Sequence, residues 1–135
     1  MATTSLILNS ALASDLDVIG DRWVLLILRD VFLGRNRFES LKAQTGASRA
    51  TLTRRLDTLL QSGILYKQPY SPSGNRFEYK LTEKGLGLFN ASMLAWQWER
   101  TWAEEEATSL PKQLHHRACE SEFIPKTVCK HCGID

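Results

Sequence analysis

The sequence has little cysteine, no long apolar run and no basic residue near its beginning. The first 118 residues contain no cysteine, and no Lys or Arg precedes Arg22. A secretory leader starts with a basic segment, so we expect none here. No segment approaches the roughly 18 consecutive apolar residues that a membrane-spanning helix needs. We therefore expect a cytoplasmic protein that does not enter a membrane.

The motifs of common enzyme classes are also missing. The chain has no glycine-rich phosphate loop, no nucleophile elbow and no pair of carboxylates on one helix face. The acidic run at residues 104–106 lies near an expected helix end and is most simply a solvated charged face. We therefore predict that the protein is not an enzyme.

Charge is distributed unevenly along the 135 residues. Residues 21–85 contain 12 Lys and Arg against 6 Asp and Glu, a net charge of +6, whereas the remainder contains 5 against 9, a net charge of −4. A basic centre favours an anionic partner for the middle of the chain, although an ordinary solvated surface could give the same counts.

Apolar spacing predicts an α+β fold that is mainly helical. Residues 14–34 repeat apolar side chains at helical spacing, which predicts one long helix. A short second helix begins at Phe38 and ends near Gly46, and a third begins at Ser48 and closes at Gly63. Two helices joined by a short turn containing glycine form a helix-turn-helix candidate.

Beyond the third helix the apolar period changes from 3.6 to 2. Residues 64–70 and 76–81 are predicted strands, separated by a turn at 71–75, and they form a hairpin with one apolar and one charged face. A further helix is expected from about residue 82 to 106. This order of elements is that of a winged helix, so we expect a winged helix-turn-helix domain over residues 1–106 and a short tail over 107–135.

The third helix and the hairpin carry side chains suited to double-stranded DNA. Arg can pair bidentately with guanine, Ser and Thr can bind bases or phosphates, and a helix N-terminus attracts phosphate. For Arg54 or Arg55 taken singly, a solvated helix face is an equally good interpretation. The candidate DNA contacts are Arg37, Ser48, Arg49, Thr51, Arg54, Arg55, Lys67, Asn75 and Arg76.

Three ordered motifs together resemble the HxlR-type regulators, winged-helix relatives of the MarR group. They are residues 16–29, Arg37-Phe38 and residues 77–85, and the resemblance covers roughly residues 10–102. It implies a homodimer whose two third helices enter successive major grooves of a near-palindromic operator. Many members carry a sensing cysteine where this chain has Ser10, so any thiol switch here must use the cysteines of the tail.

The resemblance implies that the N-terminal and C-terminal helices build the dimer. Trp96, Trp98 and Trp102 could instead form a ligand cage, but aromatic side chains at helical spacing usually pack in a core or an interface. No residue pattern identifies a small-molecule effector. The expected dimer interface comprises Leu8, Leu12, Phe89, Met93, Trp96 and Trp102.

The tail contains all three cysteines, two of them in a CxxC sequence followed by a glycine. Three thiolates and one imidazole match a closed tetrahedral zinc site, for which we predict His115, Cys119, Cys129 and Cys132 as ligands. His115 is favoured because it precedes Cys119 by one helical turn, and His116 and His131 are the alternatives. A disulfide or three free thiols would also fit the sequence.

These features together predict a sequence-specific DNA-binding transcriptional regulator. The alternative is a zinc-containing module whose winged helix binds another protein. Steep salt dependence of binding would separate the two, because release of counterions from DNA makes its affinity fall with salt.

Overall fold

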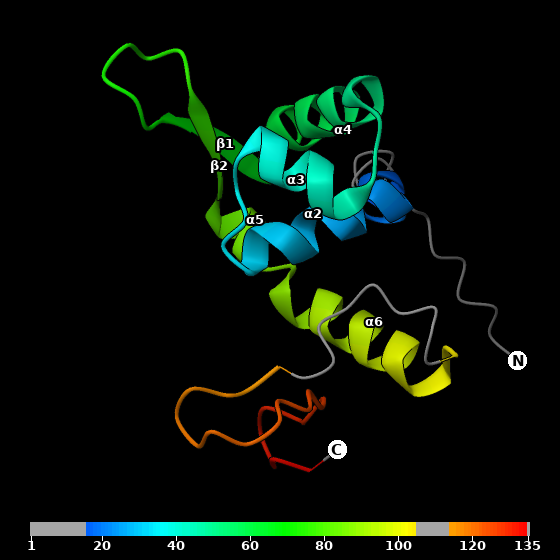
Figure 1. Ribbon diagram of the computed structural model, residues 1–135. Helices are drawn as coiled ribbons and strands as arrows, with labels where there is room; N and C mark the ends of the chain where they lie inside the picture. Colours follow the sequence, from blue (N-terminus) through cyan, green and yellow to red (C-terminus); the bar gives the residue numbers. More distant parts are fainter. Residues whose placement is uncertain (1–15, 105–113, 135) are drawn as a thin grey trace, which may run out of the picture. The chain divides into compact units, whose positions relative to one another are not determined.

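The computed structural model describes residues 16–104 and 114–134 of the chain (Figure 1). The described residues form two compact units, one ending at Gly87 and the other beginning at Leu88. The mainly helical α+β winged fold expected from the sequence is confirmed. The predicted domain boundary at residue 106 lies outside the described residues. The elements are α2 (Arg22–Phe32), α3 (Phe38–Thr45), α4 (Arg49–Gln61), β1 (Leu65–Pro69), β2 (Phe77–Leu81), α5 (Glu83–Leu86) and α6 (Phe89–Trp102).

The first predicted helix is interrupted, so the prediction of one continuous helix is wrong. A helical turn at residues 16–19 ends, and Asp21 then adopts an extended conformation. Its carboxylate accepts hydrogen bonds from the backbone N–H of Trp23 at 2.9 Å and of Val24 at 3.3 Å. Apolar spacing continues across this break, but an aspartate that binds the following N–H groups starts a new helix.

The turn between α3 and α4 forms as the sequence predicts. Gly46 ends α3 in the left-handed region at φ 70°, and its N–H donates to the carbonyl of Lys42 at 3.1 Å. Ser48 then caps α4, because its Oγ accepts the N–H of Thr51 at 3.1 Å. Both caps satisfy backbone groups that a helix end leaves unpaired, which fixes the angle between the two helices.

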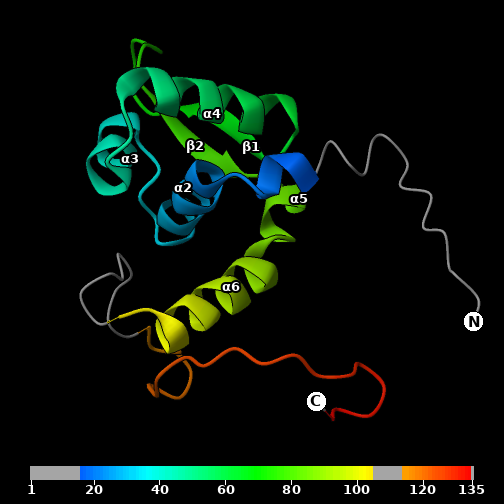
Figure 2. The same ribbon diagram turned by 90° about the vertical axis from the view of Figure 1, so that its right-hand side faces the viewer.

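A single apolar core holds α2, α3, α4 and the hairpin together, and α4 lies along the hairpin in Figure 2. Burial of one Leu or Ile side chain stabilises the fold by roughly 1.5–3 kcal/mol. The cluster therefore holds α4 firmly in place with its outer face towards solvent. Its buried members are Val24, Ile27, Leu28, Val31, Leu41, Ala47, Leu52, Leu56, Leu59, Ile64, Leu65 and Tyr79.

The hairpin is an antiparallel pair in which Leu65 faces Leu81 and Pro69 faces Phe77. Its apolar face is buried at Leu65 near the base and at Tyr79 in the middle of β2, whereas Phe77 towards the tip is 38% exposed. The tip projects beyond the helices in Figure 1. The hairpin therefore has the shape of a wing, with a shorter buried face than strict alternation predicts.

The helix predicted over residues 82–106 is divided into α5 and α6, so that prediction is corrected. Thr82 caps α5 by accepting the N–H of Gly85 at 3.0 Å, and its hydroxyl lies 2.5 Å from the carbonyl oxygen of Gly63. Two glycines close together, Gly85 and Gly87, weaken a helix at this point because each costs about 1 kcal/mol relative to alanine.

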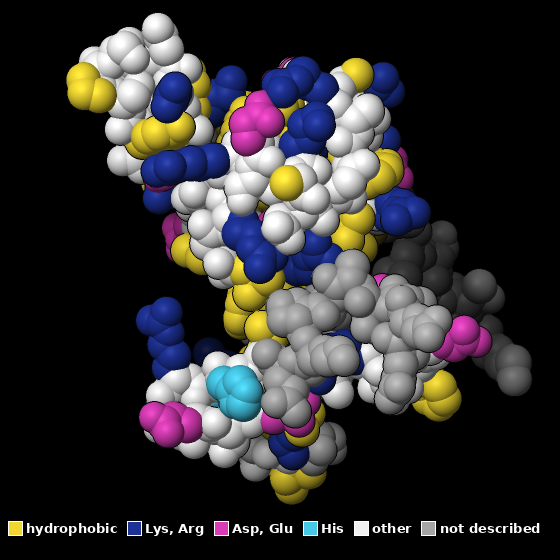
Figure 3. Space-filling model, viewed as in Figure 1, with side chains coloured by type: hydrophobic (Ala, Val, Ile, Leu, Met, Phe, Trp, Pro, Cys, Tyr) yellow, Lys and Arg dark blue, Asp and Glu magenta, His cyan; other side chains and the backbone are white. Residues whose placement is uncertain are grey.

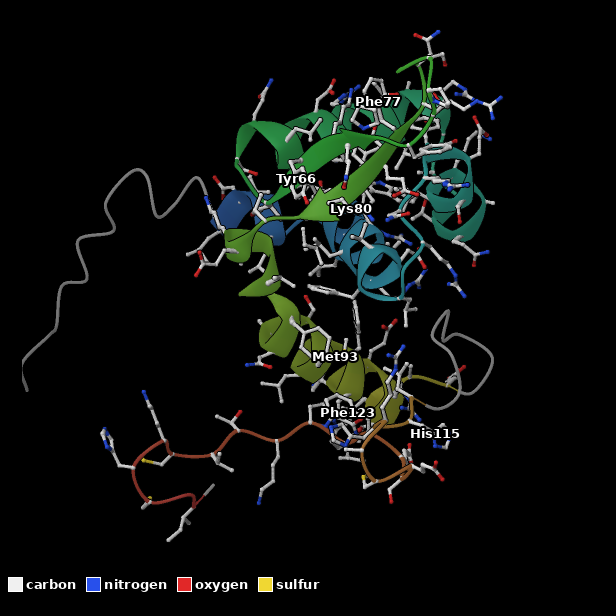
Figure 4. All side chains as sticks on the ribbon, turned by 90° about the vertical axis from the view of Figure 1, so that its left-hand side faces the viewer. Tyr66, Phe77, Lys80, Met93, His115 and Phe123 are labelled. Carbon is white, nitrogen blue, oxygen red and sulfur yellow. The ribbon has the colours of Figure 1, made fainter. Side chains whose placement is uncertain are left out.

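The second unit consists of α6 and the described part of the tail. Arg100 of α6 pairs with Glu122 at 3.0 Å, and the backbones of His115 and Glu122 form an isolated antiparallel bridge. Phe123 lines a small hollow with Met93 of α6 and lies against that helix in Figure 4. The tail therefore packs on α6 through both an ion pair and an apolar contact.

Within residues 16–104 and 114–134, none of the helices combines the length and the apolar character needed to cross a membrane.

Candidate nucleic-acid interface

The outer face of α4 presents polar and basic side chains to solvent. Ser48, Arg49 and Arg54 are exposed, and Thr51 is half-buried beside its cap. Within the described residues Arg54 forms no ion pair. Thr53 is also exposed on this helix, and sequence reasoning missed it although it follows Arg49 by one helical turn. The side chains that a helix-turn-helix would insert into a groove are therefore outward-facing.

Arg49 does not extend freely into solvent, because it is held by residues of α3. Its guanidinium pairs with Glu39 at 2.8 Å and lies over the ring of Phe38, 4.9 Å from the centroid. Both partners of the ion pair are largely exposed, so the pair contributes only about 0–1 kcal/mol. The pair therefore holds the Arg49 side chain near the start of α4, and breaking it to release Arg49 costs little free energy.

Arg55 is only partly exposed, which corrects the expectation that it extends into solvent. Its side chain is 29% exposed and its guanidinium pairs with Asp21 at 2.8 Å. Asp21 is the residue that caps α2, so Arg55 connects α4 to the beginning of α2. This placement gives Arg55 a structural role, and its contact with DNA stays a prediction.

Arg37 joins the start of α3 to the wing. Its Nη2 lies 3.1 Å from the carboxylate of Glu78, and its guanidinium stacks over Tyr70 at 4.0 Å from the ring centroid. Lys80 binds the other carboxylate oxygen of Glu78 at 3.1 Å. Hydrogen bonds from Lys80, and then from Arg37, lower the pKa of Glu78, so its carboxylate stays charged at neutral pH.

The wing carries the remaining predicted DNA contacts. Asn75 and Arg76 are exposed near the tip, and within the described residues Arg76 forms no ion pair. Lys67 lies over the aromatic rings of the opposite strand, 5.4 Å from the centroid of Phe77. Asn75 and Arg76 line an open groove together with Arg37 and Arg49, so the groove runs between the wing and the start of α4.

Basic residues are spread over the face of the first unit that Figure 3 shows. Figure 3 shows Lys and Arg side chains distributed over α3, α4 and the hairpin, with few acidic groups among them. Two acidic residues beside the groove, Glu39 and Glu78, are each paired with an arginine. This arrangement places positive charge on both sides of a groove and can accept a polyanion.

The predicted zinc ligands are divided between two places in the tail. The Sγ of Cys119 lies 3.5 Å from Nδ1 of His116, whereas Nδ1 of His115 lies 3.1 Å from the carbonyl oxygen of Glu120. In the part of the chain that the structure describes, no three His, Cys, Asp or Glu side chains lie close enough together to hold one metal ion. The zinc site therefore stays a prediction.

Hydrogen bonds favour the thiolate form of two tail cysteines. The backbone N–H of Ser121, followed by His116, lowers the pKa of Cys119. The backbone N–H groups of Cys132 and His131 lower the pKa of Cys129. All three cysteines are free and exposed, so their sulfur atoms are accessible to metals and oxidants.

The predicted dimer residues lie in different surroundings. Leu8 and Leu12 lie outside the described residues, Met93 and Trp96 are buried, and Phe89 is 37% exposed. An exposed stripe at one-turn spacing is instead formed by Leu94, Trp98 and Trp102, the last two 68% and 74% exposed. Sequence reasoning missed Leu94, which the spacing of four residues could have revealed.

Comparison with known proteins extends these observations. The HxlR-like helix-turn-helix family matches residues 18–107, a span that includes every element from α2 to α6. The uncharacterized HTH-type transcriptional regulator Mb3122 of Mycobacterium bovis is 39% identical over 118 residues, which cover 87% of this chain and 74% of that protein. The regulator sll1512 of Synechocystis is 33% identical over 92 residues, covering 67% and 68%.

Two solved structures are similar in fold. PA1607, described as a proposed transcription factor, superposes with a TM-score of 0.76 and 33% identity over 88% of this chain and 82% of that one. The reduced form of the transcriptional regulator YodB from B. subtilis gives a TM-score of 0.59 and 26% identity, over 73% and 97%.

Proposed function

Because the chain belongs to the HxlR-like helix-turn-helix family of transcriptional regulators, we propose that it binds double-stranded DNA as a homodimer at a near-palindromic operator. In this proposal α4 enters the major groove and the wing contacts the DNA backbone. The observation that carries the proposal is the groove between them, which has Arg37 and Arg49 on one side and Arg76 on the other.

The ion pairs of the free protein are compatible with this role. Arg37 and Arg49 are 55% and 63% exposed and hold carboxylates that phosphate groups can replace. Both members of the Arg49–Glu39 pair are exposed, so its exchange costs at most about 1 kcal/mol. Glu78 is half-buried and keeps Lys80 as a partner when Arg37 leaves it. In the free protein the two carboxylates orient both guanidinium groups, and phosphate groups take their place when DNA binds.

Exposed aromatic residues on α6 support the dimer. Trp98 and Trp102 form an exposed apolar stripe with Leu94. Burying this stripe against a second copy of the chain would be favourable. A two-fold dimer would present two copies of α4 to half-sites about 34–36 Å apart, which is one helical turn of DNA. The proposed interface therefore differs from the sequence expectation in using Trp98 rather than the buried Met93 and Trp96.

DNA binding can be tested by titrating mixed-sequence duplex DNA at several salt concentrations. We expect a log-log slope of about −5 to −9 if roughly 6–10 phosphates are neutralised. Arg76→Ala should weaken binding to all sequences alike, whereas Arg49→Ala should also relax the preference for the selected operator by about 1–3 kcal/mol. Arg117→Ala, an exposed change in the tail, is the matched control.

Two results would contradict this proposal. One is an absence of binding to any duplex at low salt, and the other is unchanged affinity in both arginine variants. Salt-independent binding to a protein partner would favour the alternative of an interaction module.

The dimer can be tested by sedimentation of a double variant, Trp98→Glu with Trp102→Glu. We expect monomers that bind a half-site weakly, because the two DNA contacts are then no longer linked. Tyr66→Glu places the same charge on an exposed aromatic of the hairpin and should leave the dimer intact. An unchanged mass of the double variant would refute the interface.

A further inference from the structure

Two pairs of metal-binding side chains lie in the tail, and the first pair is already arranged as ligands of one ion would be. Nδ1 of His116 and Sγ of Cys119 are 3.5 Å apart. A tetrahedral zinc ion with ordinary Zn–N and Zn–S bonds holds such atoms about 3.6 Å apart. His115 is engaged differently, since its backbone pairs with Glu122 and its ring faces the carbonyl of Glu120. His116 is therefore the better histidine ligand.

The second pair is formed by Cys129 and Cys132 in a tight turn. The N–H of Gly133 donates to the carbonyl of Cys129 at 2.8 Å, and the N–H of Cys129 donates to the carbonyl of Ile134 at 2.9 Å. Gly133 has φ 72°, which only glycine adopts at low cost. The two cysteines therefore lie in one short turn, and both thiols are exposed.

The chain between these two pairs runs along α6. Glu122 pairs with Arg100 near the C-terminal end of that helix, whereas Thr127 and Val128 line a groove with Asn90 near its N-terminal end. Figures 2 and 4 show the tail running back in the direction of the start of α6. Ten helical residues span about 15 Å, so the two pairs lie near opposite ends of α6.

One zinc ion cannot use both pairs of a single chain in this arrangement. Ligand atoms of one ion lie within about 4 Å of one another. Bringing the two pairs together would require the segment to leave α6, with loss of the Phe123 packing and of the Arg100–Glu122 ion pair. Each pair alone leaves two coordination positions open, and zinc in structural sites fills all four.

We propose that zinc joins two copies of this chain, with His116 and Cys119 from one protomer and Cys129 and Cys132 from its partner. A two-fold axis perpendicular to α6 near its middle makes the two copies of that helix antiparallel. The beginning of one helix then lies beside the end of the other, which brings unlike pairs together twice. The dimer would hold two equivalent zinc ions, and this inference rests on the proposed homodimer.

The proposal predicts complementation between two variants that are each unable to bind zinc. The first variant is His116→Ala with Cys119→Ser, and the second is Cys129→Ser with Cys132→Ser. Each homodimer should lose both sites, while wild type purified with reductant should contain about one zinc per chain. A mixed dimer, isolated through two different affinity tags, has one complete site and should contain one zinc per dimer.

Single variants test the assignment of the histidine. His115→Ala should retain wild-type zinc content, whereas His116→Ala should lose most of it. Loss of zinc in the first variant only would overturn the choice of His116.

The outcomes also separate this inference from the proposed function. A mixed dimer without zinc, beside a zinc-containing wild type, would show that each site lies within one chain. A wild type that is dimeric and binds DNA but contains no zinc would likewise overturn the inference while leaving the proposed function in place. A monomeric wild type would overturn both.

Discussion

Replacing Asp30 with Asn should strongly destabilise the first unit. Asp30 is fully buried in α2, and its two carboxylate oxygens lie 3.0 Å from Arg29 and 3.0 Å from Arg35. Arg29 is itself only 3% exposed, whereas Arg35 is 41% exposed. The substitution keeps the shape of the side chain but leaves the buried charge of Arg29 without this carboxylate.

The size of the effect follows from the burial of the two arginines. Removing one partner of a buried ion pair costs about 3–5 kcal/mol, a large part of the roughly 5–15 kcal/mol by which a domain is stable. For a domain of this size, 3 kcal/mol lowers the melting temperature by at least about 12 °C. Arg35→Gln leaves Asp30 paired with Arg29 and removes only the half-exposed partner, so it should cost less, about 1–2 kcal/mol.

Thermal and urea unfolding of both variants, followed by circular dichroism, measures the difference. Under conditions where Asp30→Asn is folded, it should bind DNA with the wild-type salt slope, because Asp30 is buried and cannot contact DNA. Equal losses of stability in the two variants would refute the argument that burial of Arg29 determines the cost.

Two further changes test other parts of the fold and interface. Gly85→Ala should lower the free energy of unfolding by more than about 2 kcal/mol, since a Cβ there would lie 2.2 Å from the carbonyl oxygen of Ile64. Gly87 has a helical φ, so Gly87→Ala should change the free energy of unfolding by less than about 1 kcal/mol in the same denaturant titration. Glu39→Gln should raise affinity for mixed-sequence DNA at low salt, because it removes a negative charge and releases Arg49. Weaker DNA binding by this variant would contradict the placement of DNA against α3.

The sequence determined those features that depend on neighbours along the chain. The helix-turn-helix could be predicted because Gly46 and Ser48 act on backbone groups only a few residues away. The wing could be predicted from alternating side chains and a turn rich in breakers. The basic face followed from the composition of these same segments, since the core stripe of α4 leaves its polar residues on the outside.

Only the tertiary structure decided which side chains are engaged before any partner binds. The pairing of Arg55 with Asp21 joins residues 34 positions apart, and that of Arg37 with Glu78 joins residues 41 positions apart. The separation of the tail pairs likewise depends on how Phe123 and Glu122 pack on α6. Local propensity carries no information about such contacts, because their energy exists only after distant segments have been brought together by the core.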